Sequence, residues 1–338
     1  VWPICVSCAS ARLCFSPAHQ TLAARLTALA EGEVSMARST AHASKRAESR
    51  PVGRVPNSQA ADTPSSATKR RLLAATLRFR RIILTYYKKH GRHDLPWRKT
   101  RDPYKILVSE VMLQQTQVER VIPFYRNFLR KFPTIRALAR APLSDVLRNW
   151  QGLGYNRRAK MLHAAAKKLS PRKISTISKL ETLPGVGPYT ARAVAAFAFN
   201  MDVVFVETNI RTAVIHHFLS RRSDIEDVEV LEVLKRAFPK GKAREWYSAL
   251  MDYGAHLKRS GISYNAQSKK YTKQSKFTGS LREARGAILR ELTEGTTSRT
   301  HLTNLLGTSR RTQVATALTA LQTEGLIQKR GKVFTLPR

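Results

Sequence analysis

The sequence is short of acidic residues, and this shortage narrows the range of partners. Its 338 residues include 23 Asp and Glu against 60 Lys and Arg, which gives a formal net charge of +37. Such a balance favours a polyanionic partner, with nucleic acid first, because neutralising phosphates releases counterions. A solvated basic surface without a specific partner is the plainer alternative, and an anionic membrane surface is a weaker one.

Cysteine and long apolar runs are scarce as well. The only cysteines are Cys5, Cys8 and Cys14. An odd set at one end is a poor disulfide framework, and the Cys5–Cys8 pair lacks the second pair that a metal site needs. No run approaches the roughly 20 apolar residues of a membrane-spanning helix. We therefore expect no metal centre, no membrane partner and a cytoplasmic, nucleoid-associated protein, while the 42% of hydrophobic residues suffices for a folded core.

The first 70 residues are expected to form a disordered or non-native extension. Residues 37–70 contain few large apolar residues and many residues that break helices. For residues 1–35 two interpretations remain open: translated upstream sequence before a start at Met36, or a targeting peptide that is rich in Ala, Ser and Arg.

Helical periodicity begins near Arg71 and continues to residue 257. The pattern predicts a helix over 104–130 that is interrupted at Pro123, further helices on both sides of Gly152–Gly154, and a helical region over 227–257. Residues 258–280 read as a basic linker or loop. In 281–338, three helical patterns precede two short apolar runs around a glycine, which is typical of a winged helix, although a small packing domain is the alternative.

Three short stretches could carry chemistry. The turn LPGVG at 183–187 leaves backbone N–H groups at a helix start, where a phosphate could bind. Glu110 lies among apolar residues, which would keep its carboxyl neutral and suited to act as a general acid, although most helical glutamates are exposed. Glu207 and Asn209 precede a helix and could merely cap it, or Glu207 could serve as a second carboxylate.

In these stretches and their surroundings the sequence resembles the helix-hairpin-helix DNA glycosylase superfamily, and within it the adenine glycosylases. The matching segments are HDLPWR at 93–98, DPYKILVSEVMLQQTQV at 102–118, GLGY at 152–155, LPGVGPYTA at 183–191 and MDYGA at 251–255. The resemblance covers residues 71–257. It implies a mainly α fold, with a two-lobed glycosylase body followed by the small winged-helix-like domain.

The resemblance also implies roles for individual residues. Glu110 resembles the catalytic acid that protonates N7 of an extruded adenine, and Glu207 and Asn209 resemble the groups that assist it. Tyr189 occupies the position where strand-cleaving relatives carry lysine, so no Schiff base can form there. Gln115 resembles a wedge that fills the gap left by the flipped base, and Trp97 and Arg98 resemble base-pocket residues. Contacts with DNA phosphates are expected from Gly185, Val186, Gly187, Lys258, Arg259, Lys269 and Lys270.

Four features depart from that family. Glu207 stands where aspartate is usual, and Asn156 replaces a second intercalating tyrosine. Lys258 stands where the first cysteine of an iron–sulfur loop is expected, so no cluster is predicted, although a monovalent cation in the hairpin is compatible with the resemblance. The winged-helix-like segment replaces the domain that checks for 8-oxoguanine.

The sequence thus predicts a monomeric, monofunctional, cluster-free glycosylase. It would remove adenine opposite 8-oxoguanine or guanine from double-stranded DNA that carries mismatched or oxidised base pairs. A thymine or uracil glycosylase on the same scaffold and a DNA-binding protein without catalysis are the alternatives.

Overall fold

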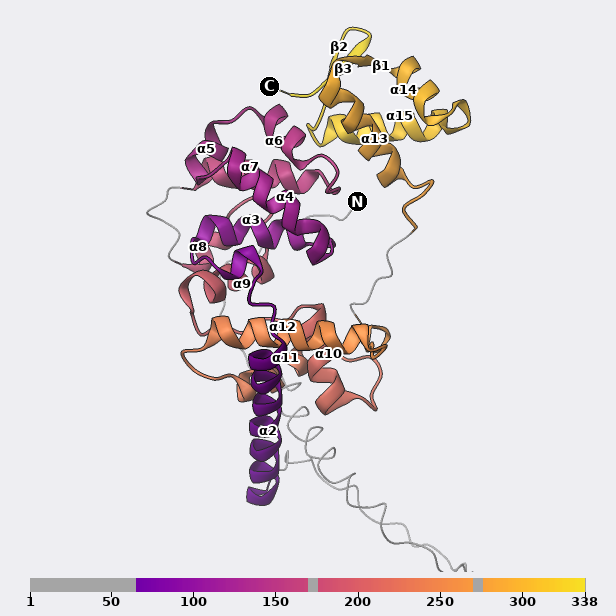
Figure 1. The fold of residues 1–338 in the computed structure, drawn as a ribbon. Coiled ribbons are helices and arrows are strands. Elements are labelled where there is room, and N and C mark those ends of the chain that lie inside the picture. Colours follow the sequence, from indigo (N-terminus) through magenta and orange to yellow (C-terminus); the bar gives the residue numbers. More distant parts are fainter. Residues whose placement is uncertain (1–64, 170–175, 270–275, 338) are drawn as a thin grey trace, which may run out of the picture. The chain divides into compact units, whose positions relative to one another are not determined.

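The computed structural model describes residues 65–169, 176–269 and 276–337 (Figure 1). The predictions that concern Cys5, Cys8, Cys14 and Lys270 lie outside these residues. The chain divides into two compact units, residues 1–79 and 80–338. Helix α2, Ser66–His90, begins in the first unit. The expectation that disorder extends to residue 70 is therefore wrong for residues 66–70. The helix can begin at Ser66 because the Ser65 hydroxyl accepts the Thr68 N–H at 3.2 Å and caps the helix.

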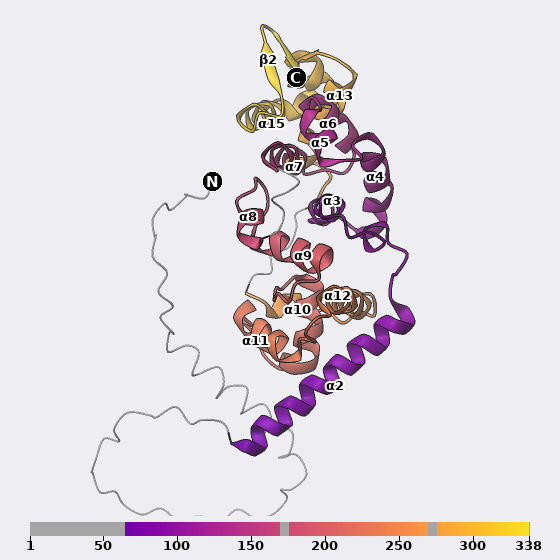
Figure 2. The same cartoon turned by 90° about the vertical axis from the view of Figure 1, so that its left-hand side faces the viewer.

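The second unit contains a set of helices between residues 103 and 259, as the all-α prediction required (Figures 1 and 2). Short 3₁₀ turns lie at Pro96–Arg98, Asn265–Gln267 and Thr308–Arg310, and a π-helical turn at Ile215–Leu219. The helices are α3 (Pro103–Leu113), α4 (Val118–Lys131), α5 (Ile135–Arg140), α6 (Leu143–Trp150), α7 (Arg157–Lys168), α8 (Ile177–Glu181), α9 (Pro188–Phe199), α10 (Thr208–Val214), α11 (Asp227–Ala237) and α12 (Ala243–Arg259).

The interruption predicted at Pro123 is wrong, because the chain breaks earlier, over Gln114–Gln117 between α3 and α4. Gln115 adopts φ 56°, a left-handed conformation that an α-helix cannot accommodate. Pro123 lies inside α4 on its exposed side, where water can satisfy the carbonyl that loses its partner. A left-handed residue rather than a proline therefore ends the first helix.

Helix α3 lies in the interior and packs against α4 and α9 (Figure 2). Pro103 opens it at a position where the missing N–H costs nothing, and the Asp102 carboxylate accepts the Tyr104 N–H at 2.9 Å. Its residues from Ile106 to Met112 are all buried, including Glu110. A helix that is apolar on every side belongs in a core, so the one carboxyl on it is unusual.

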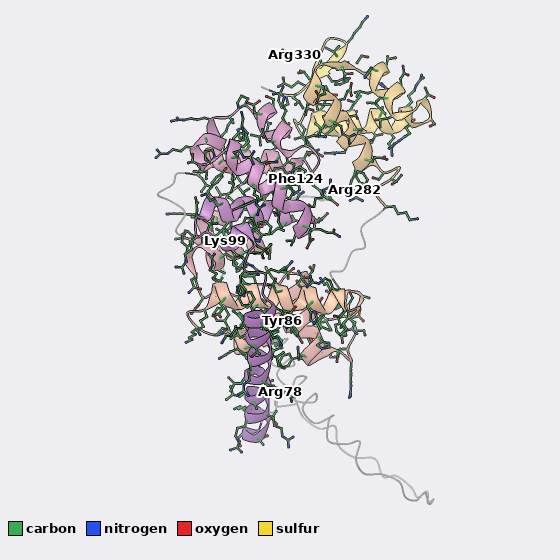
Figure 3. The ribbon with its side chains drawn as sticks, in the orientation of Figure 1. Arg78, Tyr86, Lys99, Phe124, Arg282 and Arg330 are labelled. Atoms are coloured by element: carbon green, nitrogen blue, oxygen red, sulfur yellow. The ribbon has the colours of Figure 1, made fainter. Side chains whose placement is uncertain are left out.

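The C-terminal segment forms helices and a small sheet in winged-helix order. The elements are α13 (Leu281–Glu294), β1 (Thr297–Ser298), α14 (Arg299–Leu306), α15 (Arg311–Thr323), β2 (Gln328–Arg330) and β3 (Val333–Thr335). The sheet is antiparallel with the order β1-β3-β2, so it has one strand more than the predicted hairpin. Arg330 extends away from the β2–β3 hairpin (Figure 3).

The C-terminal helices share a core with the preceding body. Ile288 of α13 and Leu318 of α15 belong to the same buried apolar cluster as Trp150 of α6 and Leu162 of α7. The segment therefore packs onto α6 and α7. Within the described ranges, no helix has both the length and the apolar character that crossing a membrane would require.

Candidate active site

Three polar side chains from distant parts of the chain meet beside α3. The Tyr189 hydroxyl, from the first turn of α9, donates a hydrogen bond to Oε2 of Glu110 at 3.0 Å. Glu207, directly before α10, is near enough to act electrostatically on both Glu110 and Tyr189. The structure therefore brings together three of the four residues that were predicted to be catalytic, and Asn209 joins them through Glu207.

Glu110 is buried, with 5% of its surface exposed, so the exposed position that most helical glutamates adopt does not apply here. Burial raises the pKa of its carboxyl from 4.5 to about 7, because desolvation penalises the charged form. The hydrogen bond from Tyr189 lowers this pKa, and the nearby Glu207 raises it. A carboxyl with a pKa near 7 still carries its proton at neutral pH in a large share of molecules, which suits a general acid.

Glu207 caps its helix, which confirms one of the two interpretations that the sequence left open, and its role as a second catalytic carboxylate stays a prediction. Its Oε1 accepts the backbone N–H groups of Asn209 at 2.7 Å and Ile210 at 2.8 Å, which makes it the N-cap of α10. Its Oε2 accepts the Thr208 hydroxyl at 3.1 Å and the Asn209 side-chain amide at 3.3 Å. These bonds hold the carboxylate beside Glu110, so the longer glutamate side chain is tied back to its own helix start.

A close approach between α10 and α12 positions this capped helix start. Gly254 of α12 lies against the Asn209 backbone, and a Cβ at Gly254 would be 2.0 Å from the Asn209 carbonyl oxygen. Only glycine permits this contact. The glycine of the MDYGA motif had no predicted role, although a glycine inside an otherwise regular helical pattern is a signal for such a close approach.

Trp97 and Arg98 make their recorded contacts with residues other than Glu110. Arg98 donates to both carboxylate oxygens of Asp252, at 2.6 and 2.9 Å, and its guanidinium lies 5.6 Å from the centroid of the Tyr87 ring. Trp97 packs edge-on against Tyr125, with ring centroids 5.4 Å apart. Their predicted base-pocket role stays a prediction, and the contacts show that they stabilise the core.

Asp252 belongs to the MDYGA motif, but no role was predicted for it from the sequence. It also binds Arg92 at 2.7 Å. Burial alone would raise the pKa of its carboxyl, but hydrogen bonds and charges from Arg98 and Arg92 hold that pKa below its usual value. This buried ionic cluster links the chain before α3 to α12.

The predicted phosphate contacts fall into different environments. Lys258 lies in the last turn of α12 and not in a loop, because the helix continues to Arg259. It is partly buried, which lowers the pKa of its ammonium, and Glu207 acts in the opposite direction. Lys269 donates to Glu226 at 2.7 Å on the surface, and Arg259 is exposed. The ammonium of Lys258 therefore interacts electrostatically with the carboxylate of Glu207.

The turn Gly185–Gly187 connects α8 and α9, as the hairpin motif predicts. The Val186 N–H bonds to the Leu183 carbonyl at 3.1 Å. Gly185 adopts φ 75°, and a Cβ there would lie 2.6 Å from that of Met161, so the turn packs closely on α7. A Cβ at Gly187 would meet nothing within 4 Å, so the backbone is open to a ligand at that end.

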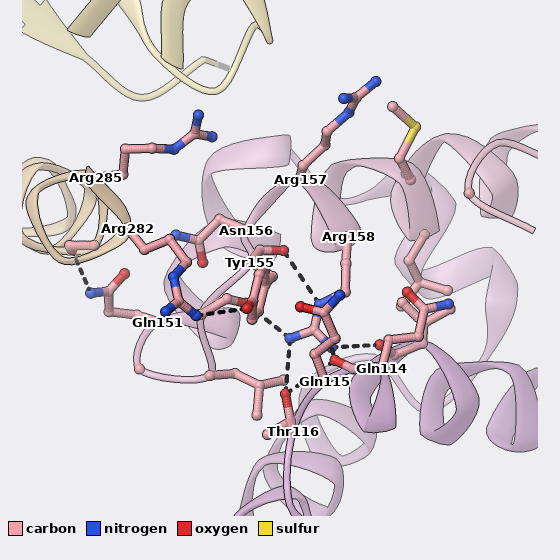
Figure 4. A pocket seen from close by; sticks show the side chains of 18 of the residues that line it. Gln114, Gln115, Thr116, Gln151, Tyr155, Asn156, Arg157, Arg158, Arg282 and Arg285 are labelled. Carbon is pink, nitrogen blue, oxygen red and sulfur yellow. Dashed lines mark hydrogen bonds between the residues drawn. The ribbon is translucent and has the colours of Figure 1, made fainter. Parts of the chain in front are cut away.

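Gln115 lines a cavity whose lining does not include Glu110. This cavity, with a volume of about 1150 Å³, is bounded by the α3–α4 loop, the turn before α7, the Gly185 turn and α13 (Figure 4). Gln115 and Tyr155 both have left-handed backbones, with φ values of 56° and 50°. Arg158 links the two loops, donating to the carbonyls of Val111 and Met112 at 2.9 and 3.0 Å and to that of Gly154 at 3.1 Å.

Comparison with known proteins identifies the family of this chain. Residues 108–240 match the model of the HhH-GPD superfamily base excision DNA repair proteins, which defines the class of the chain. The "Adenine DNA glycosylase" of Mycolicibacterium smegmatis is 34% identical over 275 residues, covering 73% of this chain and 92% of that protein. The chain therefore belongs to the adenine DNA glycosylase family, and the resemblance found in the sequence is confirmed.

Other relatives are matched over a smaller part. The Mycobacterium tuberculosis "Adenine DNA glycosylase" is 41% identical over 185 residues, covering 51% of this chain and 59% of that protein. The "Adenine DNA glycosylase" of Rattus norvegicus is 42% identical over 153 residues, covering 41% of this chain and 29% of that protein. Among solved structures, a thermostable thymine-DNA glycosylase has a TM-score of 0.47 and 28% identity, covering 54% of this chain and 87% of that one.

Proposed function

We propose that this protein hydrolyses the N-glycosidic bond of adenine mispaired with guanine or 8-oxoguanine in double-stranded DNA and leaves an abasic site. The observation that carries the proposal is Glu110, a buried carboxyl with a pKa of about 7 in a chain of the adenine DNA glycosylase family. An ionised carboxylate could not donate a proton to a leaving base, whereas a carboxyl that is neutral near pH 7 can.

In the proposed reaction, the adenine is first extruded from the helix, because its glycosidic bond is out of reach inside a duplex. Glu110 transfers its proton to N7 of adenine, and the electron pair of the C1′–N9 bond leaves with the base. The carboxylate of Glu207 stabilises the positive charge that develops on the sugar. Water then adds at C1′ and loses a proton, which Glu110 recovers.

Two neighbours support these roles by positioning the carboxyls. Tyr189 holds Oε2 of Glu110 with a hydrogen bond, and Asn209 holds Oε2 of Glu207. Tyr189 is a phenol whose pKa is raised well above 10.0 by burial and by both carboxylates, so it remains protonated. It cannot form a Schiff base as a lysine would, and this supports a monofunctional enzyme that does not cut the strand.

The residues present do not fit an iron–sulfur cluster. The sequence contains no cysteine after Cys14. At the position of the first expected ligand, the ammonium of Lys258 interacts with Glu207 and Arg211. Within the described ranges, no group of three or more His, Cys, Asp or Glu side chains could hold a metal ion. We therefore propose DNA binding without a cluster, through the Gly185–Gly187 turn and the basic surface, by a monomer near the nucleoid.

The test is a single-turnover excision assay on labelled duplexes. These carry adenine opposite 8-oxoguanine, adenine opposite guanine, and thymine opposite guanine, each developed with and without alkali. We expect adenine release that becomes a strand break only after alkali, and its loss in Glu110→Gln. Glu119→Gln, an exposed glutamate of α4, is the matched control and should retain activity. Release of thymine alone, or binding without any release, would contradict the proposal.

A further inference from the structure

A half-buried lysine lies beside the two carboxylates of the proposed reaction. Lys258 belongs to the last turn of α12, and its ammonium makes no hydrogen bond or ion pair with any residue that the structure describes. Burial lowers the pKa of this ammonium, because its charge is partly removed from water. A buried charge is costly unless it is paired, so the cation is suited to an anionic ligand.

The direction of the Lys258 side chain follows from its position on α12. Gly254 lies four residues earlier on the same face, where α12 packs against α10 and touches the Asn209 backbone (Figures 1 and 2). Side chains on a helix point back towards its N-terminus, so the lysine extends over the turn that contains Gly254. Its electrostatic interaction with Glu207, at the start of α10, agrees with this direction.

The carboxylate of Glu207 attracts Lys258 by charge but does not fix it. The hydrogen bonds to this carboxylate come from neutral groups at the start of α10: two backbone N–H groups, a hydroxyl and a side-chain amide. The guanidinium of Arg211 is occupied instead by Asp227, at 2.8 and 2.7 Å. Because no direct bond joins the ammonium to Glu207, Lys258 can exchange this partner for another anion.

The proposed reaction requires such an exchange. Glu207 is to stabilise the positive charge on the sugar, and a second cation beside it would repel that charge. The sugar of an extruded nucleotide is joined to a phosphate on each side, so extrusion brings phosphates to the same place as the sugar. A phosphodiester is anionic and accepts strong, charge-assisted hydrogen bonds from an ammonium.

We propose that Lys258 is the counter-ion of Glu207 in the free protein and moves to a phosphate beside the extruded adenosine when DNA binds. The inference rests on the proposed function. The exchange leaves Glu207 with its full negative charge when the sugar becomes positive. It also favours extrusion, because the phosphate reaches Lys258 only when the nucleotide has left the stack. The sequence predicted a phosphate contact for Lys258 in a basic loop, whereas its position on α12 assigns the contact to the active site.

The experiment combines changes in the protein with changes in the DNA backbone. Duplexes carry adenine opposite guanine, and a neutral methylphosphonate replaces the phosphate on the 5′ side of the adenosine, the one on its 3′ side, or one several nucleotides away. Affinities are measured in the Glu110→Gln background, alone and with Lys258→Met, Lys258→Arg or Lys131→Met. Lys131, exposed in the last turn of α4, is the matched control. Thermal unfolding checks that each variant is folded.

On the unmodified duplex, Lys258→Met should weaken affinity about tenfold, which is the loss of one hydrogen bond between charged groups. The slope of the logarithm of the binding constant against the logarithm of the salt concentration should become shallower by about 0.9. On the duplex whose methylphosphonate removes the contacted phosphate, the same substitution should have no further effect. Lys258→Arg keeps the charge and should retain affinity and slope, and Lys131→Met should change neither.

Single-turnover excision by proteins that retain Glu110 separates the two partners of Lys258. Lys258→Met should raise the DNA concentration needed for half-maximal rate, and the loss should not appear in the rate at saturation. A higher rate at saturation would mean that the lysine stays with Glu207 in the complex, and this would overturn the proposal.

Equal effects of Lys258→Met on all the modified duplexes would also overturn the proposal, because the lysine would then contact neither phosphate beside the adenosine. If the unaltered protein releases no adenine from any duplex, the proposed function fails instead. The inference is then still decided by the affinities in the Glu110→Gln background, which require no excision.

Discussion

Replacing Glu110 by glutamine should stabilise the protein and abolish its activity at the same time. Glutamine has nearly the same shape and can still accept the hydrogen bond from Tyr189, but it cannot ionise. The wild-type carboxyl has a pKa of about 7 in the folded protein against 4.5 as the reference value. A difference of about 2.5 pKa units corresponds to about 3 kcal/mol of unfolding free energy.

The direction with pH follows from the raised pKa. Below about pH 4.5 the carboxyl is protonated in both the folded and the unfolded chain, so ionisation costs the wild type nothing. As the pH rises towards about 7, the unfolded chain loses the proton first, and the wild type becomes progressively less stable. Above about 7 both forms are ionised and the cost of burying the charge is complete.

The measurement is thermal unfolding of both proteins across this pH range. The unfolding temperatures should nearly coincide at about pH 4.5 and differ by about 6–12 °C at about pH 8, since 1 kcal/mol shifts Tm by about 2–4 °C in a chain of this size. Glu119→Gln, on the exposed face of α4, should show no such divergence. A gap between Glu110→Gln and the wild type that does not change with pH would falsify the claim that Glu110 is buried as a neutral acid.

Three further changes test neighbouring features. Tyr189→Phe removes the hydrogen bond that lowers the pKa of Glu110, so the alkaline limb of the single-turnover pH profile should move to higher pH; an unchanged profile would separate Tyr189 from the acid. Gly254→Ala places a Cβ 2.0 Å from the Asn209 carbonyl oxygen and should lower the free energy of unfolding, measured with urea, by about 1–3 kcal/mol or more. The control is Gly286→Ala, whose Cβ meets nothing within 4 Å, and it should leave that free energy unchanged or raise it slightly. Replacing the exposed Lys329, Arg330 and Lys332 of the β2–β3 hairpin by alanine should weaken DNA affinity. The slope of the logarithm of the binding constant against the logarithm of the salt concentration should become shallower by about 0.9 per lost phosphate contact. An unchanged slope would mean that the hairpin does not contact DNA phosphates.

Much of the local structure could be predicted from the sequence, and the failures have local causes. The break at Gln114–Gln117 was missed because a left-handed glutamine leaves no signature in composition, whereas Pro123 looks like a breaker and is tolerated on an exposed side. The start of α2 was placed too late because capping by Ser65 depends on a single hydroxyl. The short strand β1 was missed because two residues carry no periodicity.

The sequence by itself determined the helical body and the absence of cysteine ligands after Cys14, because periodicity and composition can be read from the order of the residues alone. For Glu110 the apolar neighbours indicated a buried carboxyl, and the structure decided between that and an exposed one. Only the tertiary structure decided which distant groups meet. It joined Glu110 to Tyr189 across 79 positions, and it turned Arg98 towards Asp252 across 154. It also laid Arg282 on Tyr155 across 127 positions. Such contacts depend on how helices pack, and packing is set by the shapes of many side chains together, which no short stretch of sequence contains.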